Sequence, residues 1–261
     1  MDVTFGDGTR NRFDLLVIAE GAQSRTRTMV FGEVPKRRLG LYTACGSIAR
    51  QPGDDQWWTW FSAVGGRSIQ LRPDNLGTTR VNLSFLSRPK NYQDLALAEQ
   101  RDALRAEYAG VGWKAPRILD ALASAEELYV DDLTLIRAAD WVLGRTVLLG
   151  DAAWCATPIS GMGTTLALTG AYVLAGELTS ATSVDEGLRA YHARVRPLVA
   201  RAQKIPPGAP RLAHPKSRAG VTALRAALRI AGLHSVQAVA RRLPSTPSTS
   251  SVLPHYQLPD G

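Results

Sequence analysis

Apolar residues follow three spacings along the chain, and each spacing predicts a different kind of element. Two short runs at 15–18 and 146–149 are apolar on both faces, which predicts strands of a covered parallel sheet. Runs rich in β-branched and aromatic residues, separated by turn residues, predict an antiparallel meander at 41–49, 56–63, 68–73 and 80–86, and a further strand at 127–136. Helical spacing predicts helices at 94–109, 116–123, 164–179, 183–204 and 221–231. The pattern therefore predicts an α/β fold with one parallel sheet, one antiparallel sheet and C-terminal helices.

Residues 148–168, LLGDAAWCATPISGMGTTLAL, combine several features of a ligand-binding turn. The strand ends in Gly150-Asp151, at the carboxyl edge where open α/β sheets bind ligands, so Asp151 is placed to accept hydrogen bonds from a ribose hydroxyl. Gly161 and Gly163 allow backbone to approach a flat or phosphorylated ligand, and we expect Gly163 to supply any left-handed conformation that the turn needs. The helix that begins near Thr164 directs free N–H groups at this loop, which favours an anionic ligand. The alternative is a tight loop before a core helix, with Asp151 as a strand-end cap.

These residues resemble the second FAD-contacting motif of the class A flavoprotein monooxygenases, the flavin-dependent aromatic hydroxylases. That motif runs GDAA, about six residues, Pro, and then Gly-x-Gly at the start of a helix. The matching positions are Gly150, Asp151, Ala152, Ala153, Pro158, Gly161 and Gly163. The resemblance implies that Asp151 binds the ribitol of FAD, and that backbone at Pro158, Gly161, Met162, Gly163 and Thr164 contacts the flavin ring and pyrophosphate. Trp154 stands where the family often has His or Tyr, so acid–base chemistry is not supported at that position.

Residues 19–27, AEGAQSRTR, form the second motif, after a hairpin that we expect to have a two-residue turn at Asp7-Gly8. One interpretation is a polar turn in which Ser24 caps the next helix. The segment also resembles the family's A-D-G-x-x-S-x-x-R fingerprint, through Gly21, Ser24 and Arg27. The resemblance implies that Gly21 and Arg27 support the binding of FAD and the path of the nicotinamide cofactor. Glu20 replaces the usual Asp, and we expect the longer side chain to make a weaker bond to the backbone N–H groups beyond it.

Three tryptophans lie together in the predicted antiparallel sheet. Alternation along a strand places Trp58 and Trp60 on one face and Trp57 on the other. Packing in the core or on the sheet face is one interpretation. The other is the wall of a pocket for an aromatic or polycyclic substrate, with Trp58 and Trp60 binding that substrate. The resemblance supports the second interpretation, since in the family this sheet is the substrate-binding sheet.

No G-x-G-x-x-G follows a strand anywhere in the chain. In the family, a long preceding segment carries that loop within the βαβ unit that binds the ADP half of FAD. We therefore expect a C-terminal portion of such a protein, produced by a misplaced start or a disrupted gene, or completed by a partner that supplies the missing N-terminal segment. We also expect the strand between 15–18 and 147–149 to be missing. The predicted fold is thus an incomplete FAD-binding Rossmann-like parallel sheet plus an antiparallel substrate-binding sheet.

The domain boundaries follow from these assignments. Residues 1–36 are predicted to form part of the FAD-binding domain, 37–135 the antiparallel substrate-binding domain, and 136–204 the remainder of the FAD-binding domain. Composition shifts to Pro, Arg and Ala from residue 205, so 205–261 is predicted as a helical and Pro/Ser-rich tail that is poorly ordered from residue 244.

Composition and charge exclude several other classes of function. The net charge of +8 comes from arginines scattered along the chain and fits no known nucleic-acid-binding module, so nucleic acid is not an expected partner. No apolar run is long enough to span a membrane and no signal peptide is apparent, which predicts a cytoplasmic protein with no membrane partner. The sequence does not predict an oligomeric state.

Residues capable of metal or acid–base chemistry are isolated from one another. Cys45 and Cys155 lack nearby ligand partners and are expected to be reduced thiols. Asp131 and Asp132 lack a third ligand, so we expect a solvated strand edge and no metal. The histidines are isolated at no ligand spacing, and none is a candidate catalytic base: they are His192, His214, His234 and His255. No catalytic acid or base can be named from the sequence.

The resemblance implies a flavoprotein monooxygenase. Reduced FAD, made with NAD(P)H, would react with O₂ to give a C4a-hydroperoxide that transfers one oxygen atom to an aromatic or polyketide-like small molecule. The alternative is a truncated, non-catalytic remnant or a small-molecule-binding module that does not hold FAD alone. A basic nucleic-acid adaptor is a third hypothesis, which would predict salt-dependent binding to any duplex.

Overall fold

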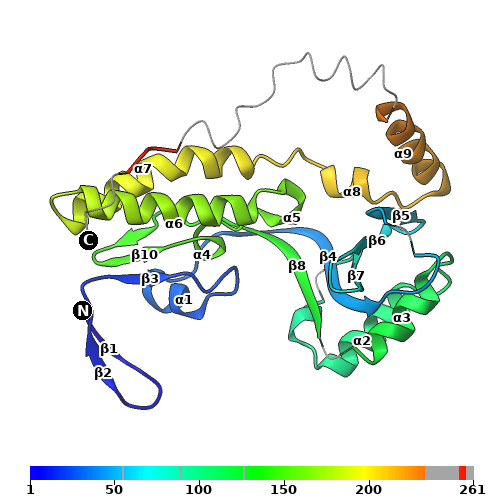
Figure 1. Cartoon of the computed structure of the whole chain (residues 1–261), viewed down its shortest axis with the longest axis horizontal. Helices are drawn as coiled ribbons and strands as arrows, with labels where there is room; N and C mark the ends of the chain where they lie inside the picture. The colour runs from blue at the N-terminus through cyan, green and yellow to red at the C-terminus, as the bar shows by residue number, and fades with distance from the viewer. Residues whose placement is uncertain (55, 89, 126, 233–252, 257–261) are drawn as a thin grey trace. The chain divides into compact units, whose positions relative to one another are not determined.

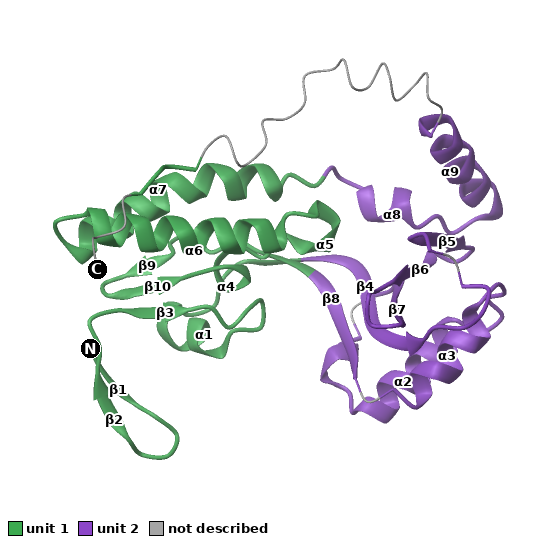
Figure 2. Ribbon diagram, viewed as in Figure 1, with its two compact units in different colours: residues 1–37, 134–205, 245–261 green, residues 38–133, 206–244 purple. Residues whose placement is uncertain are grey.

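The computed structural model describes residues 1–54, 56–88, 90–125, 127–232 and 253–256 (Figure 1). They divide into two compact units, shown in separate colours in Figure 2. Unit 1 comprises the described residues of 1–37, 134–205 and the C-terminal segment, and unit 2 those of 38–133 and 206–232. The predicted fold class, a small parallel-containing sheet with a separate antiparallel sheet and C-terminal helices, is confirmed.

The elements of unit 1 are β1 (Asp2–Thr4), β2 (Arg10–Arg12), β3 (Leu16–Ile18), α1 (Arg25–Phe31), β9 (Val142–Leu143), β10 (Thr146–Leu148), α4 (Asp151–Trp154), α5 (Thr157–Ser160), α6 (Gly163–Ser180) and α7 (Val184–Ala202). Those of unit 2 are β4 (Lys36–Ala49), β5 (Thr59–Ala63), β6 (Arg67–Pro73), β7 (Thr78–Leu86), the 3₁₀ turn η1 (Tyr92–Asp94), α2 (Leu97–Glu107), α3 (Ala115–Ala123), β8 (Leu128–Ile136), α8 (Ala209–Ala213) and α9 (Arg218–Ala231). Strands β4 and β8 each extend across a boundary between the units.

The first hairpin and the sheet after it differ in detail from the prediction. β1 and β2 pair antiparallel as expected, but Phe5 N donates to Thr9 O, so the connecting loop has three residues, 6–8, in place of two. The three-stranded sheet has the order β3-β10-β9. β3 and β10 pair directly and in parallel, with Ile18 opposite Leu148, so the expectation of a missing strand between them is wrong.

The position of β3 in its sheet also differs from the prediction. It is the outer strand of the three, and Val17 is 40% exposed, so the expected covered central position is wrong for this strand. β10 lies between β3 and β9, and Val147 and Leu148 are fully buried. A central strand can form ladder hydrogen bonds on both sides and be covered on both faces, which explains why β10 is buried throughout and β3 is not.

Helices α6 and α7 pack on each other and on this sheet to form the core of unit 1. Ser183 caps α7 by accepting a hydrogen bond from Glu186 N, as the capping-box pattern predicts. The Glu186 carboxylate completes the turn by accepting from Thr182 N in place of the Ser183 backbone. In the middle of α7, the buried Tyr191 hydroxyl donates to Leu148 O at 2.9 Å, which joins this helix to the end of β10.

The five-stranded sheet of unit 2 has the order β5-β6-β7-β4-β8. Strands β5, β6 and β7 form the predicted meander, but β4 pairs with β7 and not with β5. The expectation of a simple meander through all four strands is therefore wrong. β4 begins earlier than predicted, at Lys36, and its pairing with β7 runs from Leu41 opposite Leu86 to Ala49 opposite Thr78.

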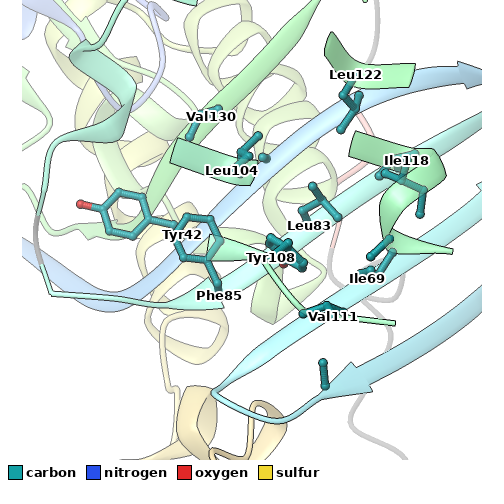
Figure 3. Close-up of a cluster of buried hydrophobic side chains, with 14 of the residues drawn as sticks. Tyr42, Ile69, Leu83, Phe85, Leu104, Tyr108, Val111, Ile118, Leu122 and Val130 are labelled. Atoms are coloured by element: carbon teal, nitrogen blue, oxygen red, sulfur yellow. The ribbon is translucent and has the colours of Figure 1, made fainter. Parts of the chain in front are cut away.

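One face of this sheet carries the hydrophobic core of unit 2, which α2 and α3 cover (Figure 3). Tyr42 and Phe85 stack at 5.7 Å between ring centroids, and Tyr108 meets Phe85 edge-to-face at 6.2 Å. The Tyr108 hydroxyl lies within hydrogen-bond distance of the carbonyl oxygens of Ser68 and Ser84, and burial raises its pKa well above the ordinary value. The aromatic cluster therefore ties α2 to two strands.

The acidic pair on β8 is only partly as expected. Asp132 is 8% exposed and its carboxylate pairs with Arg38 Nε at 3.1 Å, so the expected solvated edge is wrong for this residue. Asp131 accepts a hydrogen bond from the Tyr129 hydroxyl at 2.8 Å. Neither Cys45 nor Cys155 forms a disulfide. No helix in the described part of the chain is long and apolar enough to cross a membrane.

A C-terminal segment of unit 2 is attached to the sheet through His214. Gly65 N and Gly66 N donate to the carbonyl oxygens of Lys216 and Pro215, at 3.0 and 3.1 Å. The Ser68 hydroxyl and His214 Nε2 are 3.1 Å apart, and His214 Nδ1 is 3.0 Å from Pro210 O. Since a carbonyl oxygen only accepts, Nδ1 carries the proton and the neutral ring accepts from Ser68 at Nε2. Burial lowers the pKa of His214 below its ordinary value.

We expect unit 2 to lose stability as the pH falls below about 6.5, because protonation of His214 removes the acceptor for Ser68 and places a charge in a buried position. The folded-state pKa lies below the unfolded-state pKa, so this contribution is fully present above the unfolded-state pKa and is lost as the pH falls from there through the folded-state pKa. The measurement is the urea midpoint at about pH 7.5 and about pH 5.5, on either side of the ordinary histidine pKa. His214→Gln should reduce the difference between the two midpoints, and His255→Gln, at an exposed site, should not. Equal pH dependence in wild type and His214→Gln would contradict the expectation.

Candidate functional site

Parallel pairing of β3 and β10 brings the two predicted motifs to one edge of the sheet. Ile18 lies opposite Leu148, and Leu149 N donates to Ile18 O at 2.9 Å. Both strands run in the same direction, so the segments that follow them, 19–21 and 150–151, leave from the same edge. This is the edge where open α/β sheets bind ligands.

The buried Arg27 side chain connects these two segments by hydrogen bonds. It lies on α1 and is fully buried, and its Nη1 donates to Ala152 O while its Nη2 donates to Ala22 O, both at 2.9 Å. Burial lowers the pKa of its guanidinium. The contacts recorded for Arg27 are thus with the backbone of both motifs, and they set the position of one motif relative to the other. Contact of Arg27 with a cofactor stays a prediction.

Hydrogen bonds accepted by the Glu20 and Ser24 side chains stabilise the turn before α1. Ser24 caps the helix by accepting from Arg27 N at 3.0 Å, as predicted. The Glu20 carboxylate accepts from the Ser24 hydroxyl, from Thr26 N at 3.0 Å and from the Thr26 hydroxyl at 2.6 Å, and these bonds lower its pKa. The longer side chain therefore still reaches the backbone, and a weaker bond than that of an aspartate stays a prediction.

Asp151 begins the short helix α4 directly after Gly150. Gly150 has φ 62°, a left-handed value that favours glycine, and it turns the chain out of β10. The Asp151 side chain is partly buried, and burial raises its pKa, while a hydrogen bond from the Cys155 thiol acts in the opposite direction. Within the described residues Asp151 forms no ion pair, and a carboxylate has more acceptor positions than one thiol uses. It is therefore able to accept hydrogen bonds from a hydroxyl-bearing ligand.

The loop after Asp151 contains two glycines that face open space. Gly161 has φ 65° and ends α5, whereas Gly163 is the first residue of α6 and does not adopt a left-handed conformation, so the expectation for Gly163 is wrong. A Cβ at Gly161, Gly163 or Gly21 would meet no protein atom within 4 Å. A ligand could therefore approach the backbone at all three positions.

The beginning of α6 is the third part of this arrangement. Met162 is its N-cap, and no side chain caps the helix there. Pro158 and Thr164 are exposed, and Met162 is partly buried. An uncapped helix start presents free N–H groups and the positive end of the helix dipole, which suits an anionic group such as a pyrophosphate. The sequence-predicted loop residues therefore lie together around one helix start.

Thr157 is a residue of this loop that the sequence analysis missed. It has φ 61°, which is a strained value for a β-branched side chain. Its hydroxyl is buried and has no hydrogen-bond partner within the described residues. Strained backbone conformations cluster at functional sites. The sequence held no signal for this conformation, because a residue before proline is ordinarily restricted to extended backbone with negative φ.

Trp154 faces the core of unit 1. It is 1% exposed, lies 4.5 Å from Trp141 between ring centroids, and is close enough to Gly170 that a Cβ there would lie 2.9 Å from its ring. The position that often carries His or Tyr in the resembled motif is therefore a packing position in this chain.

The face of the unit 2 sheet opposite to the core is lined by polar side chains. The strand register places four residues in one row across the strands: Trp60, Gln70, Asn82 and Cys45. Asn82 Oδ1 accepts from the Thr43 and Ser84 hydroxyls at 3.0 and 2.8 Å, and its Nδ2 donates to Cys45 Sγ at 3.3 Å. The Gln70 amide has no hydrogen-bond partner within the described residues. This polar face was missed, although polar residues at every second position of β4 and β7 were its signal.

The three tryptophans near β5 are all exposed. The exposed fractions are 79% for Trp57, 64% for Trp58 and 49% for Trp60, so the interpretation as core packing is wrong. Trp58 precedes β5, and strand alternation therefore does not place it on a face. Trp60 lies within β5 opposite Gln70, and its ring centroid is 6.4 Å from that of His214. Of the two predicted substrate-binding residues, only Trp60 belongs to the polar face.

Comparison with known proteins identifies relatives of this site and of the fold. A family model described as FAD binding domain matches residues 6–204. A flavin-dependent monooxygenase of Legionella longbeachae is 31% identical over 207 residues, which cover 78% of this chain and 53% of that protein. The flavin-dependent monooxygenase eupH of a Phoma species is 34% identical over 249 residues, which cover 85% and 57%. The chain spans about half the length of the curated relatives that it matches.

Comparison with solved structures gives similar proteins. The tetracycline destructase Tet(51) superimposes with a TM-score of 0.75 at 27% identity, covering 98% of this chain and 66% of that one. HpxO of Klebsiella pneumoniae, in complex with FAD and uric acid, gives a TM-score of 0.68 at 28% identity, covering 88% and 59%. The matched range includes both motifs that meet at the edge of the parallel sheet, and the chain therefore belongs to the FAD-binding domain family of flavin-dependent monooxygenases.

Proposed function

We propose that this chain provides part of the FAD site and the substrate-binding sheet of a monooxygenase that hydroxylates an aromatic or polyketide-like small molecule with NAD(P)H and O₂. The observation that carries the proposal is the direct parallel pairing of β3 with β10, because the segments that carry Gly21 and Asp151 follow these strands from the same edge of the sheet. Arg27 holds the two segments together through Ala152 O and Ala22 O.

The residues present fit the ribitol and pyrophosphate portions of FAD. Asp151 has a carboxylate with free acceptor positions, suited to the hydroxyls of a sugar alcohol. The open space beside Gly161 and Gly163 leaves room for a ligand against the backbone, and the uncapped start of α6 suits a pyrophosphate. We therefore assign ribitol binding to Asp151, and backbone contacts to Pro158, Gly161, Met162, Gly163 and Thr164, with Gly21 and Arg27 in supporting roles.

The polar face of unit 2 is the proposed substrate surface. Trp60 offers an exposed ring for stacking, and the Gln70 amide has no protein partner within the described residues, so it is available to a ligand. Tetracycline destructase and the uric acid complex of HpxO are named for ring compounds that carry several polar groups. We infer a ring substrate with hydroxyl, carbonyl or amide groups, because an unsubstituted hydrocarbon would leave this face without hydrogen-bond partners.

In this proposal the cofactor and the side chains of the chain have different roles. Bound FAD, reduced by NAD(P)H, would supply the activation of O₂ and the oxygen transfer. The chain contributes binding and orientation, through Asp151 and the loop on one unit and through Trp60 and Gln70 on the other. His214 is not assigned as a base, since it is buried and both of its ring nitrogens are engaged.

The test compares FAD binding by the chain alone with FAD binding by the chain joined to the N-terminal segment of a relative such as eupH. Flavin absorbance and fluorescence titration report the affinity, and circular dichroism reports that each protein is folded. We expect the joined protein to bind FAD, and the chain alone to bind about tenfold or more weakly, which corresponds to ~1.4 kcal/mol or more, because it lacks the G-x-G-x-x-G loop.

A folded joined protein that binds no flavin would overturn the proposal. The alternative function is a remnant or binding module that does not hold FAD. It predicts that the folded joined protein binds no flavin, and that ring compounds quench its tryptophan fluorescence. Translation of the DNA upstream of Met1 gives an independent indication, since an in-frame strand followed by G-x-G-x-x-G favours the enzyme and a stop codon favours the remnant.

A further inference from the structure

A cavity lies within unit 2, beside β5 and the start of α9. Its volume is about 510 Å³, and it is bounded by β5, the loop at 110–112 and the first turns of α9. The Phe61 side chain lines it and packs against the hydrophobic core. Phe61 follows Trp60 along β5, and successive side chains of a strand point to opposite faces. The cavity is therefore separate from the proposed substrate surface.

Three arginines from different parts of unit 2 line this cavity, and no acidic residue does. They are Arg67 on β6, Arg218 at the start of α9 and Arg225 about two turns further along that helix. None of the three forms an ion pair with a carboxylate among the described residues. Like charges that converge without a counter-charge repel one another, so an anion in the cavity would relieve this repulsion.

Two of these guanidinium groups are held in place by contacts that leave donors free. Arg67 donates to Val64 O at 3.0 Å and to Glu107 O at 2.6 Å. Arg225 donates to Ser62 O at 3.1 Å, and its guanidinium lies 5.6 Å from the centre of the Phe61 ring. A guanidinium has more N–H donors than these contacts use, and positioned guanidinium groups bind planar or tetrahedral oxyanions well.

Part of the remaining wall is the glycine-containing loop 110–112. Gly110 has φ 72°, and a Cβ at Gly110 or Gly112 would meet no protein atom within 4 Å. A ligand can therefore approach the peptide groups of this loop closely. Glycine backbone combined with basic side chains is the usual chemistry of a phosphate-binding site.

We propose that this cavity binds the phosphate group of a small molecule. A carboxylate would balance only part of the charge of three arginines, whereas a dianionic phosphate balances more of it and has more acceptor oxygens to share among them. The volume also exceeds that of a phosphate ion alone, which leaves room for an organic portion beside Phe61 and Val111. The proposal is independent of flavin binding, because every residue it uses lies in unit 2.

The test is isothermal titration calorimetry of the full chain with inorganic phosphate and, separately, with 5′-AMP, at low ionic strength. Arg218→Gln is the decisive variant, since Arg218 is exposed and its guanidinium forms no hydrogen bond or ion pair within the described residues. Arg225→Gln is the second variant. Arg229→Gln is the matched control, because it removes the same charge from the same helix but does not line the cavity. Circular dichroism confirms that each variant is folded.

We expect saturable binding that weakens about tenfold or more in Arg218→Gln and Arg225→Gln, and less than about twofold in Arg229→Gln. Tighter binding of 5′-AMP than of phosphate identifies a nucleotide as the ligand class, and equal binding identifies the phosphate group alone. Equal weakening in Arg218→Gln and Arg229→Gln would show a general charge effect and overturn the proposal. Absence of saturable binding to the wild-type chain at millimolar concentrations would also overturn it.

Discussion

Asp151→Asn is expected to weaken FAD binding about 10- to 100-fold in the chain joined to a relative's N-terminal segment, because hydrogen bonds to a charged group contribute ~1.5–3 kcal/mol. The substitution keeps the shape of the side chain and its place at the start of α4, but it removes the charge that, in the proposed role, accepts from ribitol hydroxyls. Burial raises the pKa of this carboxyl, and carboxyl groups with shifted pKa values are frequent at binding sites. Titration of flavin fluorescence measures the effect.

Asp140→Asn is the matched control for this measurement. Asp140 is exposed and belongs to the same unit, so the variant changes the net charge equally and leaves the loop untouched. We expect its FAD affinity to stay within about twofold of the wild-type value. The assignment of Asp151 to the ribitol would fail if the two variants lost affinity to the same extent, or if neither lost any.

Trp154→Ala is expected to lower the free energy of unfolding of unit 1 by about 3–5 kcal/mol, the usual cost of replacing a buried Trp by Ala. Trp154 is 1% exposed, and its ring packs against those of Trp141, at 4.5 Å, and Tyr191, at 6.3 Å between centroids. Gly170 on α6 has no side chain where the ring approaches, so the cavity left by truncation could be filled only by movement of the helix. Urea unfolding followed by circular dichroism measures the loss.

Trp58→Ala provides a comparison with the same change in composition at an exposed site. Trp58 is 64% exposed and precedes β5, and we expect its free energy of unfolding to change by about 0.5 kcal/mol or less. A similar loss in both variants, or a negligible loss in Trp154→Ala, would contradict the packing role of Trp154. If Trp58 binds substrate, the exposed variant should instead lower the affinity for ring compounds while leaving stability unchanged.

Two departures from the family's motifs have local physical explanations in this chain. Glu20 replaces an Asp, and its extra methylene still allows hydrogen bonds to Thr26 N and to two hydroxyls. Trp154 replaces an imidazole or a phenol, and it packs against another tryptophan in the core. Neither change requires the backbone to move away from the shared sheet edge, which is consistent with a TM-score of 0.75 at 27% identity.

Periodicity alone located most of the elements, because helices and strands impose different spacings on apolar residues. α6 and α7 lie within one or two residues of the predicted ranges, and the Ser24 and Ser183 caps are confirmed. The short helices α4, α5 and α8 were not predicted, since four or five residues are too few to show a helical period. The two motifs were identified from residue type and spacing, and their contacts with a cofactor stay predictions.

The amino-acid sequence by itself determined which segments are apolar, where they begin and end within a few residues, and which family the chain resembles. Only the tertiary structure decided which strands are neighbours: β3 pairs directly with β10, and β4 pairs with β7. Strand pairing depends on contacts between segments far apart in the chain, and the local spacing of apolar residues does not indicate which segments make them. The same reason explains the burial of Arg27, the polar face of unit 2 and the three arginines around one cavity, since each arises where distant segments meet.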